Sequence, residues 1–150
     1  MGKIVVETVI AAPVERVFDL ARDVDVHTET ASFSGEQLVT PGRLQGLLEL
    51  GDLVAFEGRH FGIRQTFVAK IIEMSPPRRF VDEMVKGAFS WLRHDHEFHI
   101  HAEGTLMRDV VEWRAPLGLL GRIADALFLQ RHMRWFVTTK QQNLKNVAER

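Results

Sequence analysis

The order in which hydrophobic periodicities follow one another constrains this chain more than any other feature. Residues 3–10 read as a strand, and a short amphipathic helix follows at Pro13, a residue suited to the first helical turn. Apolar residues then alternate with period two from residue 52 to residue 114, and helical spacing returns from Leu117 to Val147. This order predicts an α+β fold in which a curved antiparallel sheet grips one long C-terminal helix and encloses a space.

Smaller elements are predicted between the first strand and the strand-rich region. The first helix runs to about Arg22, and either Asp23 or Asp25 can cap a second short helix that ends at Thr30. Ser32–Thr40 reads as a strand, and the proline-glycine pair after it ends that strand.

Composition limits the classes of function that need to be considered. The chain has 150 residues, 45% of them hydrophobic and 26% charged, which is typical of one globular domain spanning residues 1–150. Nineteen basic and 20 acidic side chains give a net charge of −1, so no overall field favours nucleic acid or an anionic membrane. The absence of cysteine excludes disulfides and thiolate chemistry. We expect a cytoplasmic protein, because neither a signal-peptide core nor a membrane-length apolar run is present.

Two apolar faces fix the register of the first predicted hairpin. If Phe61-Gly62 is a two-residue turn, the apolar faces of its two strands coincide, and a slip of one residue would turn one of them outward. The register pairs Val54 with Ala69, Phe56 with Phe67, Gly58 with Gln65, and His60 with Ile63.

The second predicted hairpin places polar side chains among apolar ones. Its first strand, Ser90–Ala102, alternates strictly, and its charged outer face belongs in water. With Glu103-Gly104 as the turn, Phe98 faces Asp109, so this carboxylate joins the inner face of the sheet. The inner face of the first strand carries Leu92, His94, His96, Phe98 and Ile100.

His94, His96 and Asp109 are the candidate catalytic residues. The two histidines are two positions apart on a strand, so both rings point to one side, and Asp109 lies diagonal to His96. A carboxylate-oriented histidine in an apolar cavity is a credible general base. The alternative is a satisfied polar network that orients the sheet or a ligand without turnover.

Another carboxylate can approach His94 from the preceding predicted strand, Arg79–Lys86. If Ala88-Phe89 is a tight turn, Glu83 faces His94, and a three-residue turn would present Asp82 instead.

Two histidines on one strand face are also a pattern found in zinc sites. His60 offers a further ring nitrogen, but nothing in the sequence fixes its distance from His94 and His96. We therefore expect no metal and no other cofactor.

The C-terminal helix divides into an apolar and a polar face at helical spacing. Lys140 belongs with other basic residues on a side that we expect to be solvated. The apolar stripe comprises Ile123, Ala126, Leu127, Met133, Phe136, Val137, Leu144 and Val147. The predicted solvated face comprises Arg131, Arg134, Thr138, Gln141, Gln142, Lys145 and Glu149.

Four sequence pieces resemble the START-like (SRPBCC, helix-grip) superfamily, and within it bacterial ligand-binding SRPBCC domains and polyketide cyclase/dehydrase-like proteins. They are Ile10–Asp19, Pro77–Asp82, His94–Phe98 and Gly104–Asp109, and the resemblance covers nearly the whole chain in order. It implies a seven-stranded antiparallel sheet around the C-terminal helix, with a deep apolar cavity. The matching pieces shape strands and turns, and no set of cyclase catalytic residues carries over position by position.

These observations predict a binder of a small hydrophobic molecule such as a lipid, a quinone or a polycyclic compound. The alternative is a cyclase, aromatase or dehydratase that uses His96 as base and Asp109 to orient it. An exposed aromatic pair, Phe89 and Trp91, could also anchor a homodimer. The predicted ligand contacts are Val54, Phe56, His60, Gln65, Phe67, Glu83, Leu92, His94, His96, Phe98, Met107, Asp109, Val111, Trp113, Ile123 and Leu127.

Overall fold

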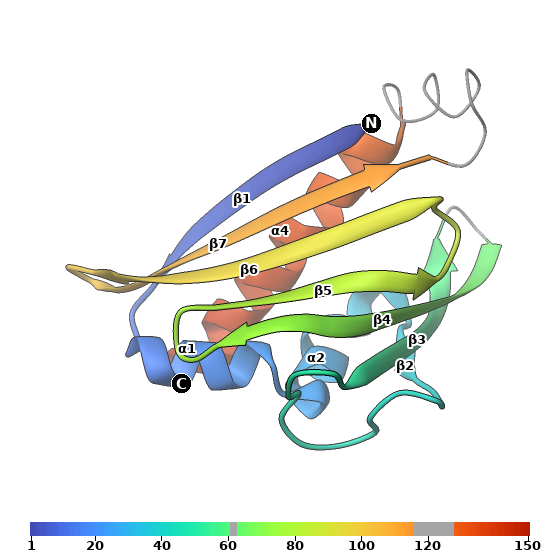
Figure 1. Ribbon diagram of the computed structural model, residues 1–150. Coiled ribbons are helices and arrows are strands. Elements are labelled where there is room, and N and C mark those ends of the chain that lie inside the picture. The colour runs from blue at the N-terminus through green and yellow to red at the C-terminus, as the bar shows by residue number, and fades with distance from the viewer. Residues whose placement is uncertain (61–62, 116–127) are drawn as a thin grey trace.

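One antiparallel sheet of seven strands dominates the computed structural model, which describes residues 1–60, 63–115 and 128–150 (Figure 1). The strand order is β1-β7-β6-β5-β4-β3-β2, and the predicted α+β helix-grip fold is confirmed. The elements are β1 (Gly2–Ile10), α1 (Val14–Ala21), α2 (Val24–Thr30), the 3-10 turn η1 (Ser32–Ser34), β2 (Gln37–Leu38), β3 (Leu53–His60), β4 (Ile63–Ser75), β5 (Arg79–Lys86), β6 (Trp91–His101), β7 (Gly104–Arg114) and α4 (Gln130–Ala148).

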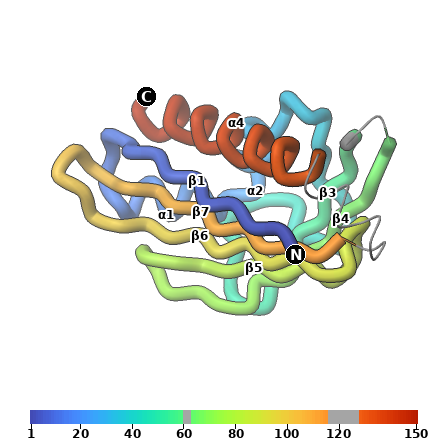
Figure 2. The backbone as a smooth tube through the Cα atoms, turned by 90° about the horizontal axis from the view of Figure 1, so that it is seen from above, coloured from blue at the N-terminus to red at the C-terminus, as the bar shows by residue number. Residues whose placement is uncertain are grey.

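Helix α4 lies along one face of the curved sheet, so that helix and sheet form two layers (Figure 2). Its apolar stripe buries Val137 and Leu144 against the sheet, as helical spacing predicts. Two shorter helices, α1 and α2, follow β1. The side chain of Asp23 caps α2 by accepting hydrogen bonds from the main-chain N–H groups of Asp25 and Val26, which decides between the two predicted caps.

Aromatic side chains join α1 to the centre of the sheet. The ring of Phe18 meets the rings of Phe80 and Phe98 edge-on, with centroid distances of 5.7 and 5.4 Å. All three rings are buried, and they belong to the larger of two hydrophobic clusters. The smaller cluster contains Trp113, which is fully buried.

The two predicted hairpin registers had different outcomes. The β3–β4 register is confirmed, with Phe56 opposite Phe67. The β6–β7 register is shifted by two residues from the prediction, so that Asp109 faces His96 directly. A shift of two keeps every side chain on its predicted face.

Gly104 explains the shift, because it belongs to β7 and not to the turn. A Cβ at this position would lie 2.3 Å from the carbonyl oxygen of Ile10, and the glycine adopts a φ of +135°. The glycine therefore serves a close approach of β1 to β7, and the hairpin turns one residue earlier, after His101. As a result Ile100, predicted to face inward, lies at the tip of the hairpin and is exposed.

The predicted strand Ser32–Thr40 is wrong in extent, because only Gln37–Leu38 pairs with β3. The hydroxyl groups of Ser32 and Ser34 donate to main-chain carbonyls three residues earlier, which favours a turn over a strand. The start of the predicted C-terminal helix, residues 117–127, lies outside the described residues.

Side chains of α4 reach along β1 and donate to its main-chain carbonyls. Gln130, Arg134 and Lys145 donate to the carbonyl oxygens of residues 3, 5 and 9 of this strand. The helix is therefore tied to the strand by polar contacts as well as by its apolar stripe. No described helix is long and apolar enough to span a membrane.

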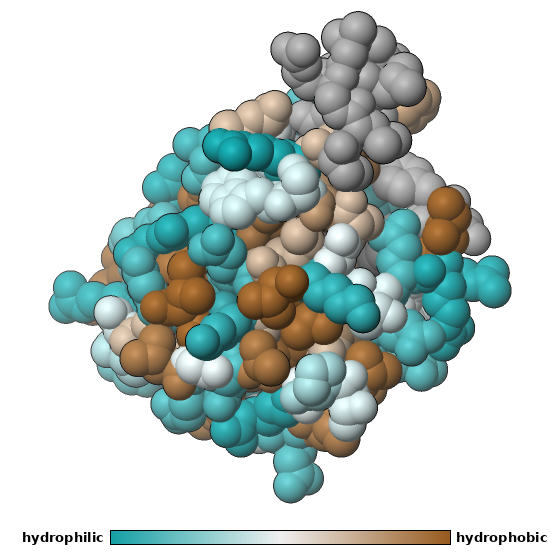
Figure 3. Space-filling view, turned by 45° about the vertical axis from the view of Figure 1, so that its right-hand side comes forward, coloured by the Kyte–Doolittle hydropathy of each residue, from teal (hydrophilic) through white to brown (hydrophobic). Residues whose placement is uncertain are grey.

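On the face drawn in Figure 3, apolar residues form small groups separated by polar ones. The predicted exposed pair Phe89 and Trp91 does not form one surface: Phe89 lines an internal cavity, whereas Trp91 lies beside Arg114, whose guanidinium is 5.7 Å from its ring centroid. A homodimer stays a prediction, without this pair to support it.

Candidate functional site

A cavity of about 530 Å³ lies between the concave face of the sheet and α4, with α1 and α2 contributing to its wall. Most of the side chains that line it are apolar, and the smaller polar set includes two hydrogen-bonded groups. The residues predicted as ligand contacts that line it are Val54, Phe56, Gln65, Phe67, Leu92, His94, His96, Met107, Asp109 and Val111.

Two inward-facing residues on the predicted list do not reach the cavity. Phe98 packs against Phe18, and Trp113 is enclosed in the smaller hydrophobic cluster. Both stabilise the sheet. The alternation of residues along a strand shows which side chains face inward, but it does not show which of these line the cavity. The side chain of His60 and residues Ile123 and Leu127 lie outside the described residues.

Glu83 is on the wrong face to meet His94. The β5–β6 register pairs Asp82 with His94 and Glu83 with Arg93, so the alternative carboxylate, Asp82, is the one that faces inward. The Glu83 carboxylate instead accepts a hydrogen bond of 3.0 Å from Trp91 Nε1. Of the two alternatives for this turn, the tight one is wrong, because β5 ends at Lys86 and β6 begins at Trp91, and the longer one gives the observed register.

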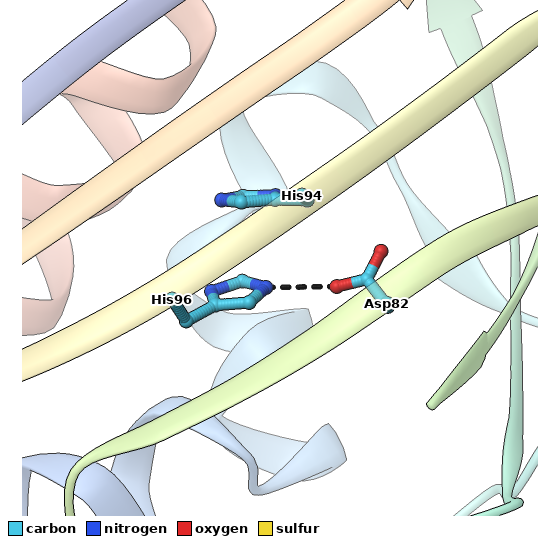
Figure 4. Close-up of side chains that lie close together, drawn as sticks. All are labelled: Asp82, His94 and His96. Atoms are coloured by element: carbon cyan, nitrogen blue, oxygen red, sulfur yellow. Dashed lines mark hydrogen bonds and ion pairs between the residues drawn. The ribbon is translucent and has the colours of Figure 1, made fainter. Parts of the chain in front are cut away.

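Four ionisable side chains from β5, β6 and β7 meet on the sheet wall, and we call them the sheet cluster: Asp82, His94, His96 and Asp109. His96 Nε2 lies 2.8 Å from Asp82 Oδ2, and a dashed line marks this contact in Figure 4. His96 Nδ1 lies 3.1 Å from Asp109 Oδ1. His94 Nε2 lies 2.7 Å from the same Asp109 oxygen. Both predicted histidines and the predicted aspartate are therefore brought into contact.

Hydrogen-bond chemistry assigns the protons in the sheet cluster. An ionised carboxylate only accepts, so each ring nitrogen facing one must carry a hydrogen. His96 faces a carboxylate with both nitrogens and is therefore an imidazolium. His94 uses only Nε2, so a neutral ring with its proton there satisfies the bond to Asp109.

The electrostatic surroundings agree with this assignment. Burial alone would lower the pKa of His96, but the hydrogen bonds and charges of Asp109 and Asp82 raise it to about 9. Burial and the adjacent His96 charge lower the pKa of His94. Burial would raise the pKa of Asp109, yet contacts with the two histidines hold it well below its usual range.

The His96 ring is sandwiched between two other rings. Its centroid lies 3.7 Å from that of His94 and 4.1 Å from that of Phe80, with interplanar angles of 19° and 13°. Figure 4 shows the two imidazoles one above the other. The flat faces of a cation are thus covered by π systems while its edges meet carboxylates.

Stacking also bears on metal binding. One nitrogen of each imidazole and an oxygen of Asp82 lie within 4.8 Å of one another, close enough in distance to share an ion. The nitrogen lone pairs lie in the ring planes, however, and the two planes run nearly parallel. In this arrangement the two lone pairs do not converge on one point, so the residues present suit a hydrogen-bonded chain better than a metal centre.

Gln141 of α4 completes the sheet cluster, and its predicted place on the solvated face is wrong. Its amide nitrogen donates to Asp109 Oδ2 and, at 2.9 Å, to the main-chain carbonyl of Val6. Its amide oxygen accepts from the Thr8 hydroxyl at 2.7 Å. Gln141 is only 1% exposed, and it joins the helix, the edge strand and the carboxylate in one network.

Lys140, the neighbouring residue, also points toward the cavity and not to the predicted solvated side. No carboxylate among the described residues lies within ion-pair distance of its ammonium, and no hydrogen bond from it is found in that part of the chain. Burial lowers its pKa, and the more distant charges of Glu36, Asp109 and Asp82 oppose that shift.

His27 and Glu36 form the second polar group on the cavity wall. His27 Nε2 is 3.2 Å from Glu36 Oε1, and the His27 ring stacks on Phe56 with a centroid distance of 4.0 Å. Burial, aided by the Lys140 charge, lowers the pKa of His27 to about 4, so the ring is neutral at neutral pH. His27 is absent from the ligand contacts that the sequence predicts.

Spacing could have identified the two helix residues that were missed. Lys140 lies three residues after Val137 and four before Leu144, and Gln141 lies four after Val137. These are the intervals that place residues on one helical face. Because their side chains are polar, Lys140 and Gln141 were instead predicted to lie on the solvated side of the helix.

Comparison with solved structures shows the same fold in proteins of distant sequence. Protein TTHA0849 from Thermus thermophilus is 20% identical, with a TM-score of 0.80 and 97% of this chain and 95% of that one covered. Major latex-like protein 151 from Panax ginseng is 12% identical, with a TM-score of 0.71 and coverage of 98% and 97%.

A third similar structure is the di-domain ARO/CYC StfQ from the steffimycin biosynthetic pathway. It is 13% identical, with a TM-score of 0.75, and the match covers 98% of this chain and 50% of that one. At these identities the likeness concerns the fold alone. No curated protein matches the sequence significantly. The family model described as "Polyketide cyclase / dehydrase and lipid transport" matches residues 1–149.

Proposed function

Because the chain belongs to the polyketide cyclase/dehydrase and lipid transport family, a ligand-binding or cyclase role follows, and we propose that it binds a small hydrophobic molecule between the sheet and α4. The cavity of about 530 Å³ carries this proposal. Lipids, quinones and polycyclic compounds are the classes that match its size and its mainly apolar wall.

The apolar wall supplies the driving force for binding. Side chains such as Phe67, Leu92 and Val111 would remove apolar ligand surface from water. Burial of about 300 Å² of such surface contributes about 7 kcal/mol before the costs of association. That is enough for useful affinity without any polar contact.

The sheet cluster suits a role in holding the cavity's shape. Both carboxylates of the sheet cluster accept hydrogen bonds from neighbouring side chains. His96 has both nitrogens occupied, so it has no lone pair with which to accept a proton from a ligand. This supports binding without turnover over a mechanism with His96 as base.

One observation keeps the enzymatic alternative open and moves its base to a different residue. Neutral His94 holds its proton on Nε2 against Asp109, and no described group bonds to its Nδ1. In a cyclase or dehydratase reaction, Nδ1 would accept a proton from carbon next to a carbonyl group. His94→Phe would then abolish turnover of a poly-β-keto substrate while leaving its binding within about threefold.

The binding proposal is tested by titrating the protein with N-phenylnaphthylamine, an uncharged apolar dye whose fluorescence rises in apolar surroundings. We expect saturable binding that Met133→Trp weakens at least tenfold, because this residue lines the cavity and a larger ring would fill it. Gln142→Trp is the matched control, since Gln142 is exposed on the same helix. Equal binding by both folded variants, or no binding by the parent protein, would contradict the proposal.

A further inference from the structure

Lys140 is a cation in the middle of the helical stripe that faces the cavity. Met133, Phe136, Val137 and Leu144 line the cavity at neighbouring positions of the same stripe. A solvated lysine would be expected on the other side of α4, where Arg131 and Gln142 lie exposed. The sequence thus places an ammonium where helical spacing requires an inward-facing side chain.

The other ionised groups on the cavity wall already have direct partners. Asp82 and Asp109 meet the His96 imidazolium, and Glu36 meets His27. Lys140 alone among these groups has no hydrogen-bond or ion-pair partner within the described residues. An ammonium group has three donors and no acceptor, so what it lacks is an oxygen acceptor.

The charges on the cavity wall decide which acceptor fits. Four carboxylates line the cavity against two cations, so the wall carries an excess of negative charge before any ligand enters. An anionic ligand would add to this excess and meet repulsion from the remaining carboxylates. A neutral acceptor satisfies Lys140 without that penalty. The carboxylates are those of Asp23, Glu36, Asp82 and Asp109, and the cations are Lys140 and the His96 imidazolium.

We propose that the ligand is a neutral, apolar carbonyl compound, such as an aryl ketone or a quinone, and that its carbonyl oxygen accepts a hydrogen bond from Lys140. This inference rests on the proposed function, because it names the class of ligand for the same cavity. Lys140 acts here as a specificity-determining residue: the apolar wall binds the body of the ligand, and the ammonium selects compounds with a carbonyl group. Hydrogen bonds to charged groups carry enough energy for selection of tenfold or more.

The experiment compares three pyrene probes of similar size by fluorescence titration. Acetylpyrene carries a neutral carbonyl, ethylpyrene replaces that oxygen with hydrogen, and pyrenecarboxylate is an anion. We expect the parent protein to bind acetylpyrene at least tenfold more tightly than either of the other two. Tenfold in affinity corresponds to about 1.4 kcal/mol.

Variants at position 140 assign the preference to the ammonium. Lys140→Met should weaken acetylpyrene binding at least tenfold and change ethylpyrene binding less than twofold, while Lys140→Arg, which keeps a charged donor, should retain the preference. Lys145→Met is the matched control on the same helix, because Lys145 bonds to Val9 and Glu149 and does not line the cavity. Circular dichroism confirms that each variant is folded.

The outcomes separate this inference from the proposed function. If ethylpyrene binds the parent protein as tightly as acetylpyrene, or if Lys140→Met weakens both equally, the carbonyl assignment is overturned and the hydrophobic cavity stands. Tighter binding of pyrenecarboxylate than of acetylpyrene overturns the argument from the charge count. If neither the pyrene probes nor N-phenylnaphthylamine binds, the proposed function itself fails.

Discussion

The charged side chains on the sheet side of the cavity have direct partners, whereas the one on the α4 side does not touch any described partner. On the sheet wall, each charged member of the sheet cluster touches a partner of opposite charge, and Gln141 completes the hydrogen bonds of Asp109. On the helix wall, one residue away from Gln141, Lys140 touches no described partner. A group that already has its partners stabilises the folded protein whether or not a ligand is present, whereas a group without a partner can still form a hydrogen bond to a ligand. The sheet cluster therefore has a structural role, and Lys140 has a role in ligand recognition.

The largest effect should follow from removing the central carboxylate of the sheet wall. Asp109→Ala leaves the His96 charge, the His94 ring and the Gln141 amide short of an acceptor in a buried place. We expect the free energy of unfolding to fall by about 3–5 kcal/mol, measured by chemical denaturation.

Asp95→Ala is the matched control for that change. Asp95 lies between the two histidines on β6 but on the outer face, where it pairs with a partly exposed Arg79. Its loss should cost about 1 kcal/mol or less. Similar costs for the two variants would remove the distinction between a buried network and a surface ion pair.

A smaller effect should appear in the pH dependence of stability. The pKa of His96 is raised to about 9 in the folded protein, against about 6.5 in an unfolded chain. The stabilisation is therefore complete below pH about 6.5 and is lost as the pH rises toward 9, by up to about 3 kcal/mol. Denaturation curves across this window should show the decline.

Comparison with His96→Gln isolates the contribution of that ring. Lys140, whose pKa is lowered by burial, acts in the opposite sense, because it adds stability as the pH rises toward the value of an unfolded lysine. The variant should be less stable at every pH, and its decline between pH about 6.5 and 9 should disappear. A decline of equal size in the variant would assign it to other groups.

The smallest effects compare two neighbours on α4. Gln141→Leu removes donors to Asp109 and to the Val6 carbonyl, and should lower the free energy of unfolding by about 1–2 kcal/mol. Lys140→Met removes a charge without a described partner whose burial is unfavourable, so this variant should not lower the free energy of unfolding. Thermal denaturation of both variants measures the two changes. If Lys140→Met lowers the stability as much as Gln141→Leu does, the sheet and helix sides of the cavity do not differ in this respect.

The sequence predicted the sheet better than the site. Phe56 and Phe67 could be paired correctly because a slip of one residue would have exposed one of two apolar faces. His96 and Asp109 were placed on the correct face for the same reason. Their direct opposition was missed because Gly104 resembles a turn residue, while its actual role depends on β1, which is distant in sequence.

The residues of α4 that face the cavity could not be predicted in the same way. Gln141 and Lys140 are polar, and residue type assigned them to water although their spacing assigned them to the cavity. Gln141 is buried because Asp109, Val6 and Thr8 satisfy its amide, and those partners are known only once the strands are in place. Residue type is therefore a poor predictor of burial for polar side chains whose hydrogen-bond partners come from distant parts of the sequence.

The contacts between α4 and β1 also have a consequence for how copies of this protein meet in solution. An edge strand with bare carbonyl groups is a template on which another chain can pair and aggregate. Along β1 the side chains of Gln130, Arg134 and Lys145 already occupy three carbonyls, so an incoming strand would have to displace these side chains first. At the opposite edge β2 pairs over only Gln37–Leu38, too short a stretch to start a stable sheet. Both edge strands of the sheet therefore disfavour the addition of a strand from another molecule.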